Sequence, residues 1–215
     1  KTSTLDLAKK FEALIDSYYD QFSGYLRTPK VPIENVKKEI KSKILPVFKS
    51  KSPDVIIESS LSAKATASSR RIRLREDANF TNKDIDQLIN HEAFIHVATT
   101  LNGRLQKKIK FLASKTGSIT KTQEGLAVFS EFITGCIDVN RMYRISDRVI
   151  AIQMAIDGAD FIEVYRFFLK REGRKNQAFE DTRRVFRGGV LTGGAPFTKD
   201  MVYLDGLVRV HNFFR

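Results

Sequence analysis

Cysteine is nearly absent from this chain of 215 residues, which contains only Cys136. A single cysteine cannot form an internal disulfide, so the sequence does not indicate an oxidising compartment. Long apolar runs are also missing. The longest, Val149–Ile156, is interrupted by Gln153 and falls well short of the roughly 18 residues that a membrane span needs. Since Lys1–Lys10 lacks the hydrophobic core of a signal peptide, we expect a cytoplasmic protein without membrane contact.

A phosphate-binding loop is absent as well. Gly188–Gly194 reads GGVLTGG, but the Lys-Ser/Thr pair that should follow the last glycine of such a loop is missing. We therefore exclude a nucleotide site here. The glycines and Pro196 instead favour turns and a β-hairpin.

Acidic residues are the minority among the charges: 25 of them face 37 basic residues, which gives a net charge of +12. Such an excess favours an acidic partner, such as nucleic acid or an acidic protein tail. The basic residues are scattered in short clusters, however, and no RNP, zinc-finger or heptad pattern accompanies them. We therefore regard nucleic acid as a disfavoured partner. One function that the charge balance allows is that of a non-enzymatic basic module that binds nucleic acid or an acidic protein. It is kept as the alternative to an enzymatic function.

Helical periodicity dominates the pattern of apolar residues, with one interruption. Val55–Ser60 is rich in β-branched residues, and Arg70–Glu76 alternates charge with Ile72 and Leu74, as a half-buried strand does. We expect these two segments to pair antiparallel, with the second as an edge strand whose arginines face solvent. The sequence therefore predicts an α+β fold that is mostly helical and contains a small antiparallel sheet.

The length of the chain favours one hydrophobic core. We expect a single domain over residues 1–215, with N-terminal helices in 1–50 and the core of the fold in 54–215. The start at Lys1, without Met, is consistent with a fragment of a longer chain.

Histidine is scarce too: two of the three histidines lie close together, in His91-Glu92-x-x-x-His96. This pattern is one residue longer than the zinc-protease motif H-E-x-x-H. In a regular α-helix, residues five apart point about 140° away from each other, so the two histidines could not share one ion. A π-type turn reduces this angle to roughly 50°, and such turns occur mostly at functional sites. A metal site here therefore predicts a locally wide helix.

The helix that carries this pattern should be capped by Thr81 or Asn82 and should end at Gly103. The alternative is that the histidines are structural, with one exposed and the other packed beside Phe94. Two of three histidines in one helix, preceded by an alternating strand, favour the metal site. A strand followed by the active-site helix is also the order found in zincins.

A third ligand should come from a separate element. Thr120 and Gln123 form a capping-box pattern, which predicts a helix with Glu124 in its first turn and Glu131 two turns further on the same face. Either glutamate could instead be a solvated surface residue. Glu131 could also hold a metal-binding histidine by hydrogen bonding. The residues alone leave open which of the two is the ligand.

Gln123–Gly135, QEGLAVFSEFITG, resembles the signature of the bacterial QEGLA-motif proteins, long described as a domain of unknown function. With the two-histidine pattern and the region FRGG…LTGGAPFTKDMVYLDGL, the chain is also similar to the eukaryotic microtubule-associated tyrosine carboxypeptidases, which are zinc enzymes. The similarity extends from about Val55 onward. It implies a zincin-like metallopeptidase with Zn²⁺ as its cofactor.

The resemblance also implies roles for individual residues: His91, His96 and Glu124 bind zinc, and Glu92 is the general base. Zinc lowers the pKa of a bound water toward ~7, and Glu92 accepts its proton and later protonates the leaving amine. We expect hydrolysis of a peptide bond near the C-terminus of a protein or peptide whose tail is acidic. Lys199 and Tyr203 are candidate substrate-binding residues.

Overall fold

The computed structural model of the chain describes residues 3–19, 29–61, 63–113 and 117–215. The chain forms two compact units. The first contains residues 1–24 and 138–208, and the second contains residues 25–137 and 209–215. The expectation of a single domain stays a prediction.

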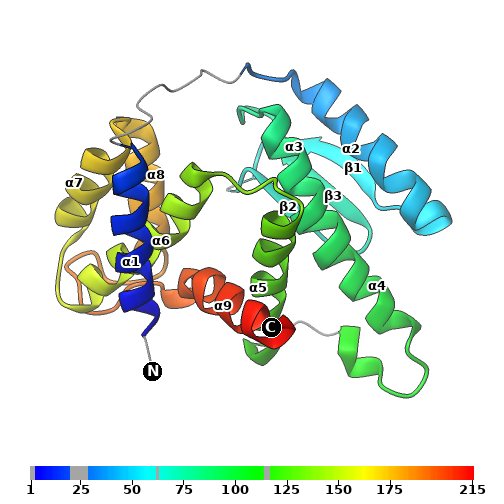
Figure 1. Cartoon of the computed structure of the whole chain (residues 1–215). Helices are drawn as coiled ribbons and strands as arrows, with labels where there is room; N and C mark the ends of the chain where they lie inside the picture. Colours follow the sequence, from blue (N-terminus) through cyan, green and yellow to red (C-terminus); the bar gives the residue numbers. More distant parts are fainter. Residues whose placement is uncertain (1–2, 20–28, 62, 114–116) are drawn as a thin grey trace. The chain divides into compact units, whose positions relative to one another are not determined.

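The second unit combines a short sheet with the helices around it (Figure 1). Its elements are α2 (Ile33–Phe48), η1 (Lys49–Lys51), β1 (Asp54–Glu58), β2 (Ala65–Ala67), β3 (Arg71–Arg75), α3 (Asn82–Leu88), the π-helix η2 (Ile89–Val97), α4 (Ala98–Leu105), η3 (Lys110–Ala113) and α5 (Gly117–Ile133). In Figure 1, α3, η2 and α4 follow one another as one long helix. The elements β2, α2 and α5 all pack against η2.

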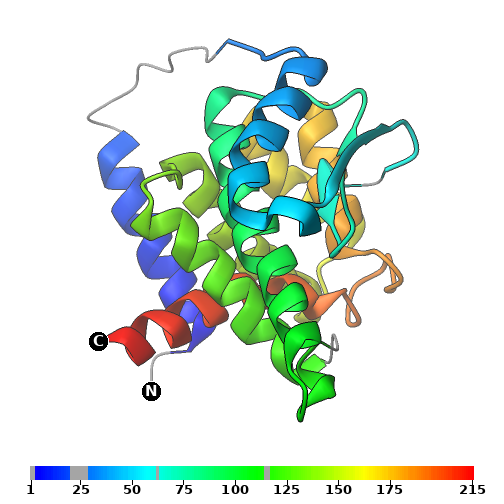
Figure 2. The same ribbon diagram turned by 90° about the vertical axis from the view of Figure 1, so that its right-hand side faces the viewer.

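The core of the second unit lies between α2, one face of the sheet, and the helix formed by α3 and η2. Helix α2 packs against β1, and Figure 2 shows it alongside the strands. The fully or nearly fully buried apolar side chains come from all three elements: Val36, Ile40 and Ile44 from α2; Val55, Ile72 and Leu74 from the sheet; and Ile85, Ile89, Ala93 and Val97 from the long helix. This packing fixes η2 along one of its sides.

The sheet corrects the predicted strand pairing. Strands β1 and β3 pair in parallel, with Val55 opposite Ile72, whereas β2 pairs antiparallel with β3. The strand order is β1-β3-β2, so the sheet is mixed and β3 is its central strand rather than an edge. The prediction failed because the short Ala65–Ala67 segment looks like a linker in the sequence. This segment runs back along the sheet and occupies the second side of β3.

The predicted alternation within β3 is confirmed. Ile72 and Leu74 are buried, whereas Arg71 is exposed and Arg73 and Arg75 are half-buried. Arg73 forms an ion pair with Glu58 of the neighbouring strand at 3.1 Å. The arginine face therefore also supports the sheet.

Two helix boundaries differ from the predictions. Gly103 does not end the helix, because α4 continues to Leu105. A Cβ atom at Gly103 would lie 2.6 Å from the backbone of Leu112 and Ala113, so the glycine permits a close approach between α4 and η3. Helix α5 begins at Gly117, and Glu124 therefore lies beyond its first turn. The cap at Thr81 is confirmed, since its side chain accepts a hydrogen bond from the N–H of Asp84.

The first unit is helical in the residues described. Its elements are α1 (Thr4–Tyr19), α6 (Val139–Ile156), α7 (Phe161–Glu172), α8 (Lys175–Val185), η4 (Thr198–Met201) and the first part of α9 (Val202–Phe214). Its core is formed by α6, α7 and α8, with Ile152, Val164, Phe168 and Val185 buried. The Gly188–Gly194 segment forms turns, as expected, but the predicted β-hairpin is wrong, because no strand forms there.

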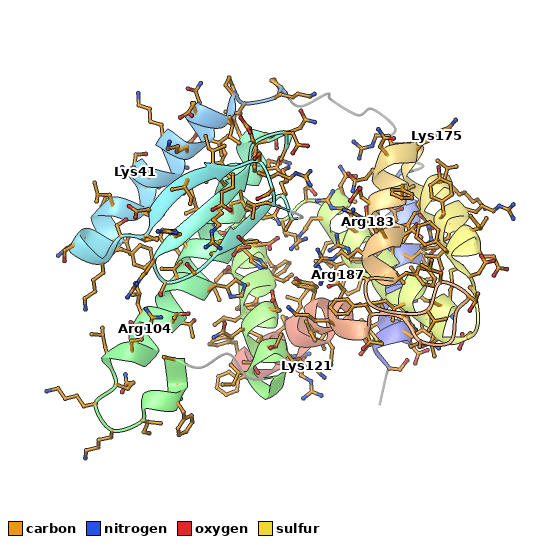
Figure 3. The ribbon with its side chains drawn as sticks, turned by 180° about the vertical axis from the view of Figure 1, so that it is seen from behind. Lys41, Arg104, Lys121, Lys175, Arg183 and Arg187 are labelled. Atoms are coloured by element: carbon orange, nitrogen blue, oxygen red, sulfur yellow. The ribbon has the colours of Figure 1, made fainter. Side chains whose placement is uncertain are left out.

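Basic side chains are distributed over many elements, as their scatter in the sequence predicts. Figure 3 labels Lys41 on α2, Arg104 on α4 and Lys121 on α5 in the second unit. None of the helices in the described residues combines the length and apolar character that a membrane span requires.

Candidate metal centre

The π-helix η2 brings the two histidines together. It spans Ile89–Val97, which confirms the wide helical turn that the His91 to His96 spacing predicts. The centroids of the two imidazole rings are 4.9 Å apart, and the rings meet edge to face. Burial of Ile89, Ala93 and Val97 against the sheet holds one side of η2, and α5 packs against η2 as well.

Glu124 of α5 lies beside both histidines. Its Oε2 atom is 3.4 Å from Nε2 of His91 and 3.5 Å from Nε2 of His96. The candidate ligand atoms of the three residues all lie within 4.8 Å of one another. All three side chains are largely shielded from solvent, with His91 buried and the other two side chains 14% exposed.

These separations fit a small tetrahedral cation. Two donor atoms that are each about 2.1 Å from a tetrahedrally coordinated zinc are about 3.4 Å apart. The two distances from Glu124 to the histidines match this spacing. Two imidazoles and one carboxylate are also a donor set that zinc accepts at catalytic sites, where a fourth position stays open.

Glu131 contacts the ring nitrogen of His91 that does not face Glu124. It lies seven residues after Glu124, on the same face of α5, and its side chain is fully buried. Its Oε1 atom is 2.7 Å from Nδ1 of His91, which donates the hydrogen bond. The Nε2 atom of His91 thereby faces Glu124, and the orientation of the ring is fixed from both sides.

The carboxylates control the charge of the imidazole. Burial alone would lower the pKa of His91, but hydrogen bonds with Glu124 and Glu131 outweigh burial and raise this pKa to about 9. Burial would raise the pKa of Glu124, but its contacts with His91 and His96 hold this pKa well below its usual range. The two carboxylates therefore favour the charged, doubly protonated imidazole of His91, and a metal ion that binds at Nε2 displaces a proton.

Glu92 follows His91 in η2 and is half-buried. Its negative charge is one of the causes that raise the pKa of His91, so the two side chains are close enough to interact. Its role as a general base stays a prediction.

Lys199 and Tyr203 belong to the first unit, whereas the metal-binding candidates belong to the second. Lys199 is exposed in η4, and Tyr203 is half-buried at the start of α9. The guanidinium of Arg141 lies over the ring of Tyr203, 5.9 Å from its centroid. Their roles in substrate binding stay predictions.

The sequence analysis assigned no role to Asn90, which helps to attach η2 to its surroundings. Its side-chain amide donates to the carbonyl of Asp86 at 2.9 Å and contacts Sγ of Cys136. Ser130 of α5 reaches the carbonyl of Asn90 at 3.4 Å. Asn90 directly precedes His91, and Ser130 directly precedes Glu131. No spacing pattern in the sequence predicts these contacts.

Comparison with known proteins agrees with the resemblance drawn from the motifs. A model of the family described as microtubule-associated tyrosine carboxypeptidase matches residues 1–215, the whole chain. A search of curated proteins found no match.

Proposed function

The chain belongs to the microtubule-associated tyrosine carboxypeptidase family, and on this basis we propose that it is a zinc-dependent peptidase that removes residues from the C-terminus of a protein or peptide. The observation that supports this most is the convergence of His91, His96 and Glu124 within 4.8 Å. We further propose that residues 1–215 form a single catalytic domain.

His91, His96 and Glu124 would hold the zinc ion. When bound, zinc polarises the substrate carbonyl and lowers the pKa of the attacking water. Glu92 accepts the proton of this water and returns it to the leaving amine. Glu131 fixes the ring of His91, so that Nε2 keeps its direction during the reaction.

The net charge of +12 suits a substrate with an acidic tail. An extended tail cannot add to β3, because this central strand already has β1 and β2 as neighbours. The sheet edges that remain for strand addition are those of β1 and β2. Of these two strands, β2 packs against η2.

Replacing the proposed base tests this function. Glu92→Gln keeps the size of the side chain but cannot accept the proton, so hydrolysis should fall by at least about 100-fold while zinc stays bound. Release of C-terminal residues from acidic peptides is measured by mass spectrometry, with C-terminally amidated peptides for comparison. Glu76→Gln, an exposed glutamate of the same unit, is the matched control and should keep full activity.

Hydrolysis by Glu92→Gln at the wild-type rate would exclude Glu92 as the base. A protein that binds no zinc and hydrolyses no peptide would instead support the alternative of a basic binding module. That module would bind its partner with a steep dependence on salt, because displaced counterions would dominate the affinity.

A further inference from the structure

The candidate metal centre depends on the width of η2. His91 and His96 come together only because this segment is wide, since in a regular α-helix they would point about 140° apart. Helices of the π type are rare and are found frequently at functional sites. The chain should therefore contain groups that hold η2 in its wide form.

Apolar packing does not choose between the wide and the regular form. The buried residues Ile89, Ala93 and Val97 follow one another at intervals of four. Residues four apart lie about 40° from each other in an α-helix, so these side chains would share a face in the regular form too. Apolar burial is also non-directional. Directional hydrogen bonds are needed to select the wide form.

The backbone ladder changes at both ends of η2. At the start, the N–H of Ile89 is shared between two carbonyls, which lie three and four residues back. At the end, the N–H of Ala98 is shared between carbonyls five and three residues back. A shared N–H cannot align well with both acceptors. These two junctions are therefore where η2 can most easily convert to a regular helix.

A polar side chain lies at each junction. The amide of Asn90 donates to the carbonyl of Asp86 at 2.9 Å, next to the first junction. The hydroxyl of Thr100 donates to the carbonyl of His96 at 2.8 Å, next to the second. Bonds from side chains to the backbone compete with the ladder of an α-helix and distort it. Both side chains thus favour the departure from regular geometry.

Asn90 also ties η2 to the end of α5. Its amide contacts Sγ of Cys136 at 3.6 Å, and the N–H of Cys136 donates to the carbonyl of Glu131 at 3.0 Å. Asn90 is thereby connected, through one residue, to the glutamate that orients His91. A rotation of the first turn of η2 would break these contacts.

We propose that Asn90 is a positioning residue that, together with Thr100, keeps η2 wide and so holds His91 and His96 at one metal ion. Asn90 acts through the backbone of η2 and is not a ligand. Without it, η2 relaxes toward an α-helix, in which His96 turns away from His91. The proposal rests on the proposed function, because it concerns the zinc site of that function.

The zinc affinity of Asn90→Ala tests the proposal. Competition with a chelator of known affinity should show a loss of at least about tenfold, because the two imidazoles no longer converge. Thr100→Val keeps the shape of the side chain without its hydroxyl and should also weaken zinc binding. Asn90→Ser should recover most of the affinity, since its hydroxyl can bond to the carbonyl four residues back. Asn102→Ala, which removes an exposed asparagine of α4, is the matched control and should change the affinity less than twofold.

Two further readouts separate positioning from a structural role. The absorption spectrum of cobalt(II), bound in place of zinc, depends on ligand geometry, so it should change in Asn90→Ala and not in Asn102→Ala. The metal-free protein should unfold in denaturant at the same midpoint in both variants, because the regular helix is the ordinary form of the chain.

An unchanged zinc affinity and cobalt spectrum in Asn90→Ala would overturn the proposal. A marked loss of metal-free stability in this variant would also overturn it, because it would show a general structural role. The wild type distinguishes these failures from failure of the proposed function. A wild type that binds no zinc would contradict both, whereas hydrolysis that does not depend on Glu92 would contradict the proposed base alone.

Discussion

His91 is held by a carboxylate at each ring nitrogen, Glu131 at Nδ1 and Glu124 at Nε2. The two contacts have different consequences. Glu131 is fully buried and fixes the ring of His91. Glu124 also contacts His96, so its carboxylate belongs to the group of three residues that could hold a cation. On the proposed function, Glu131 would therefore support metal binding by orienting His91, without being a ligand itself.

Glu131→Gln tests this difference. Glutamine keeps an oxygen that can accept the Nδ1–H of His91 but removes the negative charge, so zinc affinity should fall by roughly 10- to 100-fold. Competition with a chelator of known affinity measures the change, and Glu76→Gln provides the control on the surface. Unchanged affinity in Glu131→Gln would mean that Glu131 only fills space in the core.

Asp147 in the first unit should make stability depend on pH. Burial, together with the negative charges of Asp16 and Asp181, raises the pKa of Asp147 to about 7. Arg171 lies 3.7 Å away, but Glu12 and Asp16 also contact its guanidinium, so it only partly offsets the burial of Asp147. Because the folded state holds this proton more tightly than the unfolded chain, the free energy of unfolding should fall between about pH 4 and pH 7 and then level off.

Asp147→Asn removes this cost. The variant should match the wild type in stability near pH 4 and exceed it above pH 7, by at most about 4 kcal/mol. Denaturant unfolding at both pH values measures the difference, and Asp157→Asn, at the exposed end of the same helix, should show no such trend. A gain of equal size at both pH values would contradict the account.

At the scale of elements, the most informative prediction from the sequence is the π-helix. Two histidines five residues apart can share an ion only if the helix is locally wide, and η2 is wide over that stretch. The reasoning succeeded because ligand geometry places a strict condition on the backbone. The cap at Thr81 was predictable for a similar reason, since capping depends on neighbouring residues.

Strand pairing was not predictable in the same way. The alternation of Ile72 and Leu74 identifies β3 as a half-buried strand, but nothing in these residues specifies which neighbours it has. The partner on its second side, β2, has only three residues, and their small side chains give no clear period. Pairing depends on contacts between distant segments, which local patterns do not encode.

Gly103 gives a test of close packing between elements. Glycine within a helix is usually replaced by alanine with a gain of up to about 1 kcal/mol. At Gly103 the new Cβ would meet the backbone of Leu112 and Ala113 at 2.6 Å, so Gly103→Ala should destabilise the protein by about 1–3 kcal/mol. Gly117→Ala, at the start of α5 where nothing lies within 4 Å, should be neutral or stabilising in the same thermal unfolding assay. Equal effects of the two substitutions would show that the α4–η3 contact contributes little.

At the scale of the whole molecule, the family match covers residues 1–215, although the motifs that suggest it begin near Val55. The residues that converge at the candidate metal centre all come from the second unit, between His91 and Glu131. The sequence indicated this set, but it could not decide between Glu124 and Glu131 by spacing alone. The side chains favour Glu124 as the proposed ligand, because its carboxylate contacts both histidines, whereas Glu131 contacts Nδ1 of His91.

The metal content of the native protein tests the central claim most directly. The histidines of the candidate centre can be compared with the third histidine, His211, which is exposed near the end of α9. Elemental analysis should find about one zinc per chain in the wild type and in His211→Ala, and almost none in His91→Ala or His96→Ala, because three protein ligands are the minimum at a catalytic zinc site. A folded wild-type protein that binds no zinc, or a His96→Ala variant that retains all of it, would contradict the metal centre described above.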